Sequence, residues 1–124
     1  MNIVEVLINS ETDLLQCREI AQSTSRAAGF SLLDQVRITT AVSEIVRNVL
    51  SYAKQGKMCL NQNQKGIEIM IEDKGPGIPQ TVLEGKRSGG SGLGVGLPGS
   101  RRLMDNFDVQ TGVHGTRITM AKWL

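Results

Sequence analysis

Two side chains able to do chemistry, Glu44 and Asn48, lie four residues apart in the first half of the chain. The apolar residues around them recur at three- and four-residue steps, which predicts a helix. Residues four apart share one face of a helix. A carboxylate beside an amide oxygen suits Mg²⁺, which prefers oxygen ligands, or the activation of a hydroxyl group. Taken alone, the pair is also compatible with an ordinary solvated helix face.

The segment Asp73-Lys74-Gly75-Pro76-Gly77 follows directly on an alternating apolar and acidic run that predicts a strand. A carboxylate at the end of a strand can accept a hydrogen bond from an exocyclic amine such as that of adenine. Two glycines let the backbone turn tightly beside a flat base. An ordinary turn would explain the same five residues if they stood alone.

Three further glycines, Gly92, Gly94 and Gly96, precede a segment that predicts a helix starting near Pro98. Backbone N–H groups at glycines and at a helix start can hold a phosphate. The residues 94–99 also fit the dinucleotide fingerprint G-x-G-x-x-G, but the preceding Ser-Gly-Gly-Ser-Gly cannot be the strand that this fingerprint needs. A P-loop is excluded because the chain has no Gly-Lys-Ser or Gly-Lys-Thr. A surface loop is the remaining alternative to a phosphate cradle.

Capping patterns and hydrophobic periodicity predict the elements that position these residues. We expect three long elements first: a strand over 2–9, a helix from Ser10 to a cap at Gly29, and a second helix from Ser31 to about Ala53. The rest of the chain predicts a hairpin of strands 57–61 and 67–72, a loop region from Gly75 to Gly99 with a short helix near 81–84, a helix over 98–105, and strands 107–110 and 116–122.

Composition narrows the class of protein. The chain has 124 residues, which fits one domain over 1–124. A net charge of +2 and 3% aromatic residues argue against nucleic-acid binding. No apolar run is long enough to span a membrane and no signal peptide is evident, so we expect a cytoplasmic protein. The two cysteines have no metal-site spacing and are predicted to be buried thiols.

The three motifs occur in an order that resembles the N box and the G boxes of the GHKL ATPases, a superfamily that includes gyrase and the histidine kinases. The matching residues are Glu44-x-x-x-Asn48, Asp73-x-Gly75-x-Gly77, Gly92-x-Gly94-x-Gly96 and Gly115-Thr116. The stretches DQVRITTAVSEIVRN, EDKGPGIP, GLGVGLPGSRRLMD and AKWL further resemble the RsbT-type serine kinases of the bacterial stressosome, relatives of the anti-sigma factor kinases.

The resemblance implies an α+β fold: a single GHKL (Bergerat) domain, a two-layer sandwich with helices on one face of a mixed, mostly antiparallel sheet. It also implies a protein-serine/threonine kinase that transfers the γ-phosphate of Mg-ATP to a STAS-domain antagonist protein and, when released, activates a PP2C-type phosphatase. An anti-sigma factor, or a nucleotide-dependent sequestering switch with little kinase activity, is the alternative.

The resemblance assigns a role to each motif residue. Glu44 would be the general base, and Asn48 the Mg²⁺ ligand. Asp73 would bind the adenine amine with Thr116 nearby. The glycines would shape the pocket and contact phosphates: Gly75 and Gly77 at the adenine, and Gly92, Gly94 and Gly96 at the phosphates. Residues 80–91 would form the ATP lid, from which Arg87 or Lys86 would reach the γ-phosphate.

Overall fold

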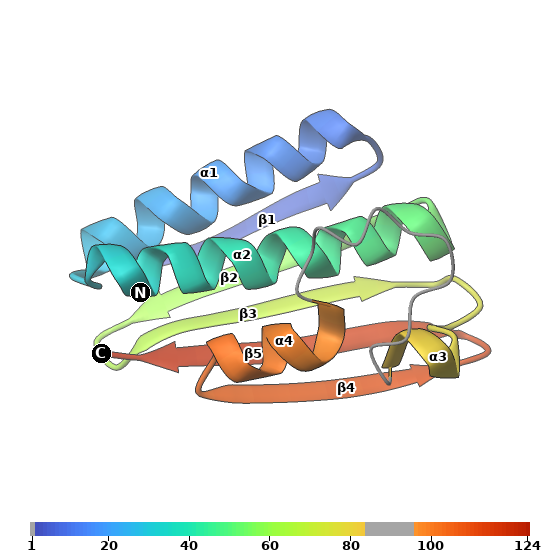
Figure 1. The fold of residues 1–124 in the computed structure, drawn as a ribbon. Helices are drawn as coiled ribbons and strands as arrows, with labels where there is room; N and C mark the ends of the chain where they lie inside the picture. The colour runs from blue at the N-terminus through green and yellow to red at the C-terminus, as the bar shows by residue number, and fades with distance from the viewer. Residues whose placement is uncertain (1, 84–95) are drawn as a thin grey trace.

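The computed structural model describes residues 2–83 and 96–124, which form two layers (Figure 1). One layer is a five-stranded sheet in the order β1-β2-β3-β5-β4, and the helices cover one of its faces. The strands are β1 (Asn2–Ile8), β2 (Gly56–Asn63), β3 (Gly66–Asp73), β4 (Asn106–Gly112) and β5 (Gly115–Trp123). The helices are α1 (Glu11–Ala28), α2 (Leu32–Asn48), the π-helix η1 (Val49–Ala53), α3 (Gln80–Leu83) and α4 (Gly96–Leu103).

This architecture confirms the predicted α+β fold class, with one refinement. Each pairing between neighbouring strands of the described sheet is antiparallel, so the sheet is not mixed. Strands β2 and β3 also extend further into their hairpin than predicted, because Asn63 pairs with Gly66 and leaves a turn of two residues. The side chain of Asn63 closes that turn by accepting hydrogen bonds from the backbone of Lys65 and Gly66.

Both long helices begin at the predicted caps. Asp13 Oδ2 accepts hydrogen bonds from the backbone N–H groups of Asn9 and Ser10, at 2.7 and 3.1 Å. Ser31 Oγ accepts one from the N–H of Asp34 at 3.1 Å. These contacts satisfy N–H groups that have no partner inside the helix. Gly29 ends α1 with φ of 100°, a conformation that favours glycine.

The second helix does not run to Ala53 as one α-helix, which corrects the prediction. The α-helix ends at Asn48 and the chain continues as the wider π-helix η1. The backbone N–H of Lys54 then donates to the carbonyl of Val49 at 2.8 Å and closes this segment. Hydrophobic periodicity does not separate the two helix types, because both keep an apolar face turned to the sheet.

The core lies between the sheet and the helices. The apolar stripe predicted for the second helix, Ile38, Val42, Ile45 and Val49, is buried against the sheet. Its partners are the alternate residues of the strands, among them Val6, Ile8, Met58, Leu60, Ile67, Ile69, Ile71, Ile118 and Met120. Cys17 of α1 is buried in this core, and burial raises the pKa of its thiol to about 11. Cys59 is only half-buried, so the prediction of two buried thiols holds for one of them.

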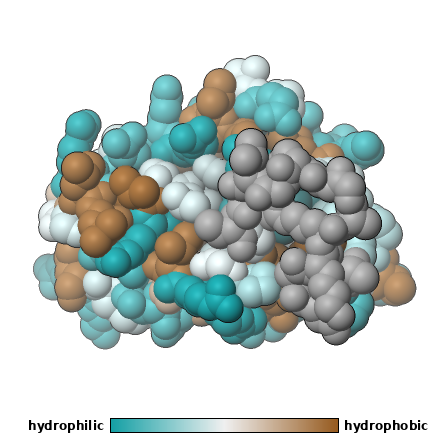
Figure 2. Space-filling model, in the orientation of Figure 1, coloured by the Kyte–Doolittle hydropathy of each residue, from teal (hydrophilic) through white to brown (hydrophobic). Residues whose placement is uncertain are grey.

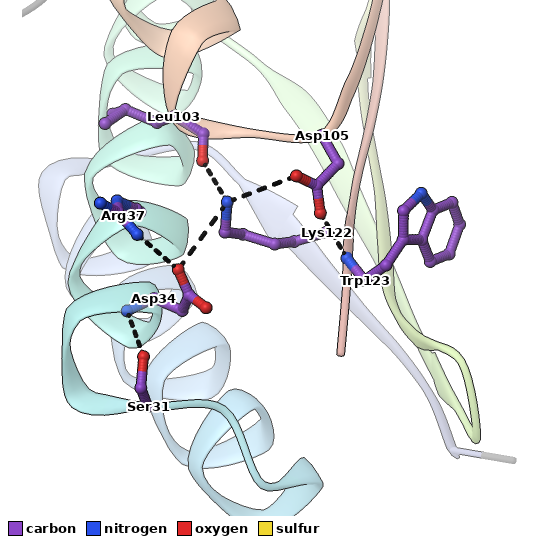
Figure 3. Close-up of polar contacts among 7 residues, drawn as sticks. All are labelled: Ser31, Asp34, Arg37, Leu103, Asp105, Lys122 and Trp123. Carbon is purple, nitrogen blue, oxygen red and sulfur yellow. Dashed lines mark hydrogen bonds and ion pairs between the residues drawn. The ribbon is translucent and has the colours of Figure 1, made fainter.

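A buried lysine ties three elements together at the far end of the sheet (Figure 3). Lys122 of β5 is 8% exposed, and its Nζ donates to the carbonyl of Leu103 at 2.9 Å. The same Nζ lies 3.8 Å from Asp34 Oδ1 at the start of α2 and 3.7 Å from Asp105 Oδ1 after α4. Asp105 in turn accepts a hydrogen bond from the backbone of Trp123 at 2.7 Å. Lys122 therefore holds the end of α4 to the start of α2.

Lys122→Met is expected to lower the free energy of unfolding by about 2 kcal/mol, because it removes the cation that lies between Asp34 and Asp105. Asp34 keeps its ion pair with Arg37 at 2.8 Å, so the loss falls mainly on Asp105. The effect stays below that of a fully buried pair since both carboxylates are partly exposed. Urea unfolding measures it, with Lys65→Met in the exposed β2–β3 turn as the matched control. Equal stability of the two variants would contradict a stabilising role for Lys122.

Candidate nucleotide site

Glu44 and Asn48 lie on the last two turns of α2, on the helix that packs against α4. Glu44 is 3% exposed, and its Oε1 lies 3.5 Å from Arg47 Nη1. Asn48 is half-buried and is the last residue of the α-helix. A buried carboxylate is costly unless charge or hydrogen bonds compensate it. The burial of Glu44 therefore argues against an ordinary solvated helix face.

The π-helix brings the end of α2 against the loop that follows β3. A Cβ atom added to Gly75 would lie 2.6 Å from Ala53 Cβ and 2.8 Å from Ala53 Cα. No side chain fits there, so glycine allows the loop and η1 to touch. This contact places the Glu44/Asn48 motif and the Asp73-x-Gly75-x-Gly77 motif at one corner of the domain, although the sequence separates them by a full hairpin.

Asp73 ends β3 and holds its carboxylate by a local hydrogen bond. Its Oδ1 accepts from the backbone N–H of Gly75 at 2.9 Å. Within the described residues Oδ2 has no hydrogen-bond partner, and the side chain is half-buried. One carboxylate oxygen thus orients the group, and the other remains an acceptor for a ligand's amine.

Two threonines complete the wall beside Asp73. Thr116, which is buried, faces Asp73 across the β3–β5 pairing. Its Oγ1 lies 2.7 Å from Thr111 Oγ1, which also accepts a hydrogen bond from the backbone N–H of Ile78 at 2.9 Å. Sequence reasoning missed Thr111. Thr111 could have been found from its position in the predicted hairpin around residues 112–115, where it pairs with Thr116.

Gly77 and Gly115 are both required by close backbone approaches at this corner. Gly77 has φ of 95°, and a Cβ atom there would lie 2.6 Å from the carbonyl oxygen of Gly112. A Cβ atom on Gly115 would collide with the carbonyl oxygen of Asp73. The two glycines therefore let the Asp73 loop lie directly against the β4–β5 turn.

Gly96 starts α4, two residues before the predicted start at Pro98. It has φ of 72°, and its carbonyl accepts a hydrogen bond from Ser100 Oγ at 2.8 Å. Figure 1 shows the first turn of α4 below the second half of α2 and on the side of α3. A helix start presents unpaired N–H groups and a partial positive charge to that side.

The other predicted phosphate contacts, Gly92, Gly94 and Arg87 with its alternative Lys86, lie outside the described residues. The same holds for most of the predicted lid over 80–91, of which residues 80–83 form α3. The structure thus brings Glu44, Asn48, Asp73, Gly75, Gly77 and Thr116 to one end of the domain, with Gly96 on the neighbouring helix.

The donor set of this corner fits Mg²⁺ and a purine nucleotide. Among the described residues no cluster of three His, Cys, Asp or Glu side chains could hold a metal by itself. Mg²⁺ commonly takes one or two protein oxygens and completes its shell with phosphate and water. The side-chain oxygen of Asn48 could supply one such ligand, and Asp73 Oδ2 offers the acceptor that an adenine amine requires.

Comparison with known protein families agrees with this geometry. Residues 33–123 match the family described as histidine kinase-, DNA gyrase B- and HSP90-like ATPase. The chain belongs to this family. The match spans every predicted motif and each element from α2 onward, so it confirms the proposed GHKL membership.

Two characterised kinases are similar to this chain in sequence. The chain is 42% identical to the serine/threonine-protein kinase RsbT of Bacillus subtilis (strain 168), over 96% of this chain and 95% of RsbT. It is 30% identical to the adaptive-response sensory kinase SasA of Synechococcus sp. (strain CC9311), over 68% of this chain and 24% of SasA. The near full-length likeness to RsbT confirms the prediction of an RsbT-like serine/threonine-protein kinase of the GHKL type.

Solved structures show the same fold. The RsbU and RsbW domains of Rv1364c from Mycobacterium tuberculosis superpose with a TM-score of 0.73 at 16% identity, over 100% of this chain and 33% of that one. The histidine kinase domain of a blue-light activated kinase from Erythrobacter litoralis gives 0.58 at 19% identity, over 90% and 63%. In the described part of this chain no helix has the length and apolar character needed to cross a membrane.

Proposed function

We propose that this protein transfers the γ-phosphate of Mg-ATP to a serine or threonine of a STAS-domain antagonist protein. The observation that carries the proposal is the packing of η1 against Gly75, which joins the buried Glu44 and its neighbour Asn48 to the adenine-type acceptor Asp73. The 42% identity to the serine/threonine-protein kinase RsbT supports a protein hydroxyl as the acceptor.

Each residue has a defined task in this proposal. Asp73 Oδ2 accepts a hydrogen bond from the adenine amine, and Thr116 lies beside it. Asn48 holds Mg²⁺, which would neutralise charge on the phosphates. Glu44 accepts the proton of the attacking hydroxyl, and Arg47 at 3.5 Å balances its charge when no substrate is bound. Phosphoryl transfer asks a protein mainly for positioning and charge neutralisation, which these groups and the start of α4 supply.

The surface also suits a protein that exchanges partners. Figure 2 shows apolar side chains gathered on the helix-covered side at the start of α2, where Leu32, Leu33 and Val36 are exposed. Clustered exposed apolar residues are typical of protein interaction sites. We propose that the protein, once released from the STAS-domain protein, binds and activates a PP2C-type phosphatase in a sigma-factor stress response in the cytoplasm.

Transfer of labelled phosphate tests the kinase proposal. The protein is incubated with Mg²⁺, γ-labelled ATP and the STAS-domain protein encoded beside it, and the labelled residue is mapped by mass spectrometry. Label on one serine or threonine, lost when that residue is changed to alanine, is the expected result. If the chain binds both ATP and the STAS-domain protein but transfers no label, it is a sequestering switch, and the kinase proposal is wrong.

A further inference from the structure

A groove of about 800 Å³ lies at one end of the sheet, on the face that the helices leave open. Its floor is a row of cross-strand neighbours, Leu7, Lys57, Glu72 and Arg117, each of which has at least one chain neighbour buried in the core. The connection from Ala53 to Gly56 and the residue Lys74 close its end. The groove and the candidate nucleotide site thus share η1 and the segment that begins at Asp73. The candidate nucleotide site, however, lies on the face of the sheet that the helices cover.

The groove carries a surplus of positive charge. Four basic side chains line it, Lys54, Lys57, Lys74 and Arg117, against the two carboxylates of Glu72 and Asp73. The surplus equals the net charge of the whole chain, +2, so the remaining surface is balanced. Opposite charges attract partners over several ångströms and orient their encounter.

The carboxylate of Glu72 is paired and one oxygen of Asp73 is hydrogen-bonded, whereas two of the lysines have no ion pair among the described residues. Glu72 lies 3.1 Å from Arg117 Nη2 and 3.5 Å from Lys57 Nζ. Asp73 accepts its hydrogen bond from the backbone of Gly75. Within the described parts of the chain neither Lys54 nor Lys74 forms an ion pair, and both are exposed. These two ammonium groups are therefore available to an external anion.

The backbone at Lys54 is strained, which points to a use for its side chain. Lys54 has φ of 75°, and among the described residues it is the one non-glycine residue with a positive φ. Glycine adopts this conformation without a steric penalty, whereas other residues are destabilised by it. A lysine at a glycine-type position beside a cationic groove suggests that its charge is needed there.

We propose that this groove docks an acidic segment of a partner protein. Carboxylates of the segment would pair with Lys54 and Lys74, and an apolar residue would cover Leu7, which is 63% exposed. Nucleic acid fits less well, because no aromatic side chain lines the groove for base stacking. The interaction goes beyond phosphotransfer, and a chain without kinase activity would still show it.

Fluorescence anisotropy with a labelled octaglutamate peptide tests the proposal on the full chain. The peptide should bind at low salt and dissociate at high salt. Lys74→Glu should weaken binding about tenfold relative to Lys65→Glu, which makes the same charge change in the β2–β3 turn. Lys54→Gly should weaken binding about threefold while raising the urea midpoint, because strain is relieved as charge is lost.

Three results would overturn this assignment. The first is no binding of the peptide by the unmodified chain at low salt. The second is equal affinity of Lys74→Glu and Lys65→Glu, which would mean that general surface charge captures the peptide. The third is equal competition by a single-stranded oligonucleotide of the same charge, which would indicate a polyanion site without preference for carboxylates.

Discussion

Glu44→Gln is expected to slow phosphotransfer to the STAS-domain protein by about 10²- to 10⁴-fold while ATP affinity changes little. The amide keeps the shape of the buried side chain but cannot accept the proton of the attacking hydroxyl. Because Glu44 is buried beside Arg47, the neutral variant also leaves that cation without its carboxylate. Single-turnover transfer of γ-labelled phosphate measures the rate, and calorimetry measures ATP binding.

Glu68→Gln provides the matched control, since Glu68 is an exposed carboxylate on β3 that belongs to no part of the site. It should transfer phosphate at the rate of the unmodified chain. A Glu44→Gln variant that transfers at the same rate as Glu68→Gln would remove Glu44 from the catalytic step. Loss of ATP binding together with activity would instead assign Glu44 to nucleotide binding.

Asp73→Asn is expected to lower ATP affinity about 100-fold without unfolding the domain. The amide oxygen of asparagine can still accept the hydrogen bond that Gly75 donates to Asp73, so the loop keeps its shape. The amide NH₂ group then takes the place of Oδ2 and faces the adenine amine. Both groups are hydrogen-bond donors, so the hydrogen bond between the carboxylate and the amine is lost. Calorimetric titration with ATP measures the loss.

The ratio of ATP to GTP affinity gives a sharper readout for Asp73→Asn. An amide donor suits the carbonyl oxygen of guanine better than a carboxylate does, so the ratio should fall. Asp108→Asn on the exposed part of β4 is the control and should leave both affinities unchanged. An unchanged ratio in Asp73→Asn would show that this side chain does not contact the base.

The sequence predicted the helices well where residues close in the sequence determine where a helix begins or ends and which face it buries. The caps at Ser31 and Gly29 and the apolar stripe of α2 are short-range features, so they can be recognised without the fold. The motif residues Glu44 and Asp73 were also recognisable, because their types and spacing carry chemistry. Their roles in catalysis and binding remain predictions.

Other features depend on contacts between distant segments and left no local pattern. The change from α-helix to π-helix after Asn48 accompanies the packing of η1 against Gly75, a contact between segments that the β2–β3 hairpin separates in the sequence. Lys122 joins the last strand to α4 by a hydrogen bond and to α2 by an ion pair, and no local pattern around residue 122 indicates these contacts. Antiparallel pairing throughout the sheet likewise required the strand order.

A crystal structure with a non-hydrolysable ATP analogue and Mn²⁺ would test the central claim most directly, because Mn²⁺ replaces Mg²⁺ and gives an anomalous signal. We predict an anomalous peak within coordination distance of Asn48, adenine hydrogen-bonded to Asp73 and the γ-phosphate beside Glu44. Nucleotide bound elsewhere, or a metal peak remote from Asn48, would contradict the claim that these residues form one Mg-ATP site.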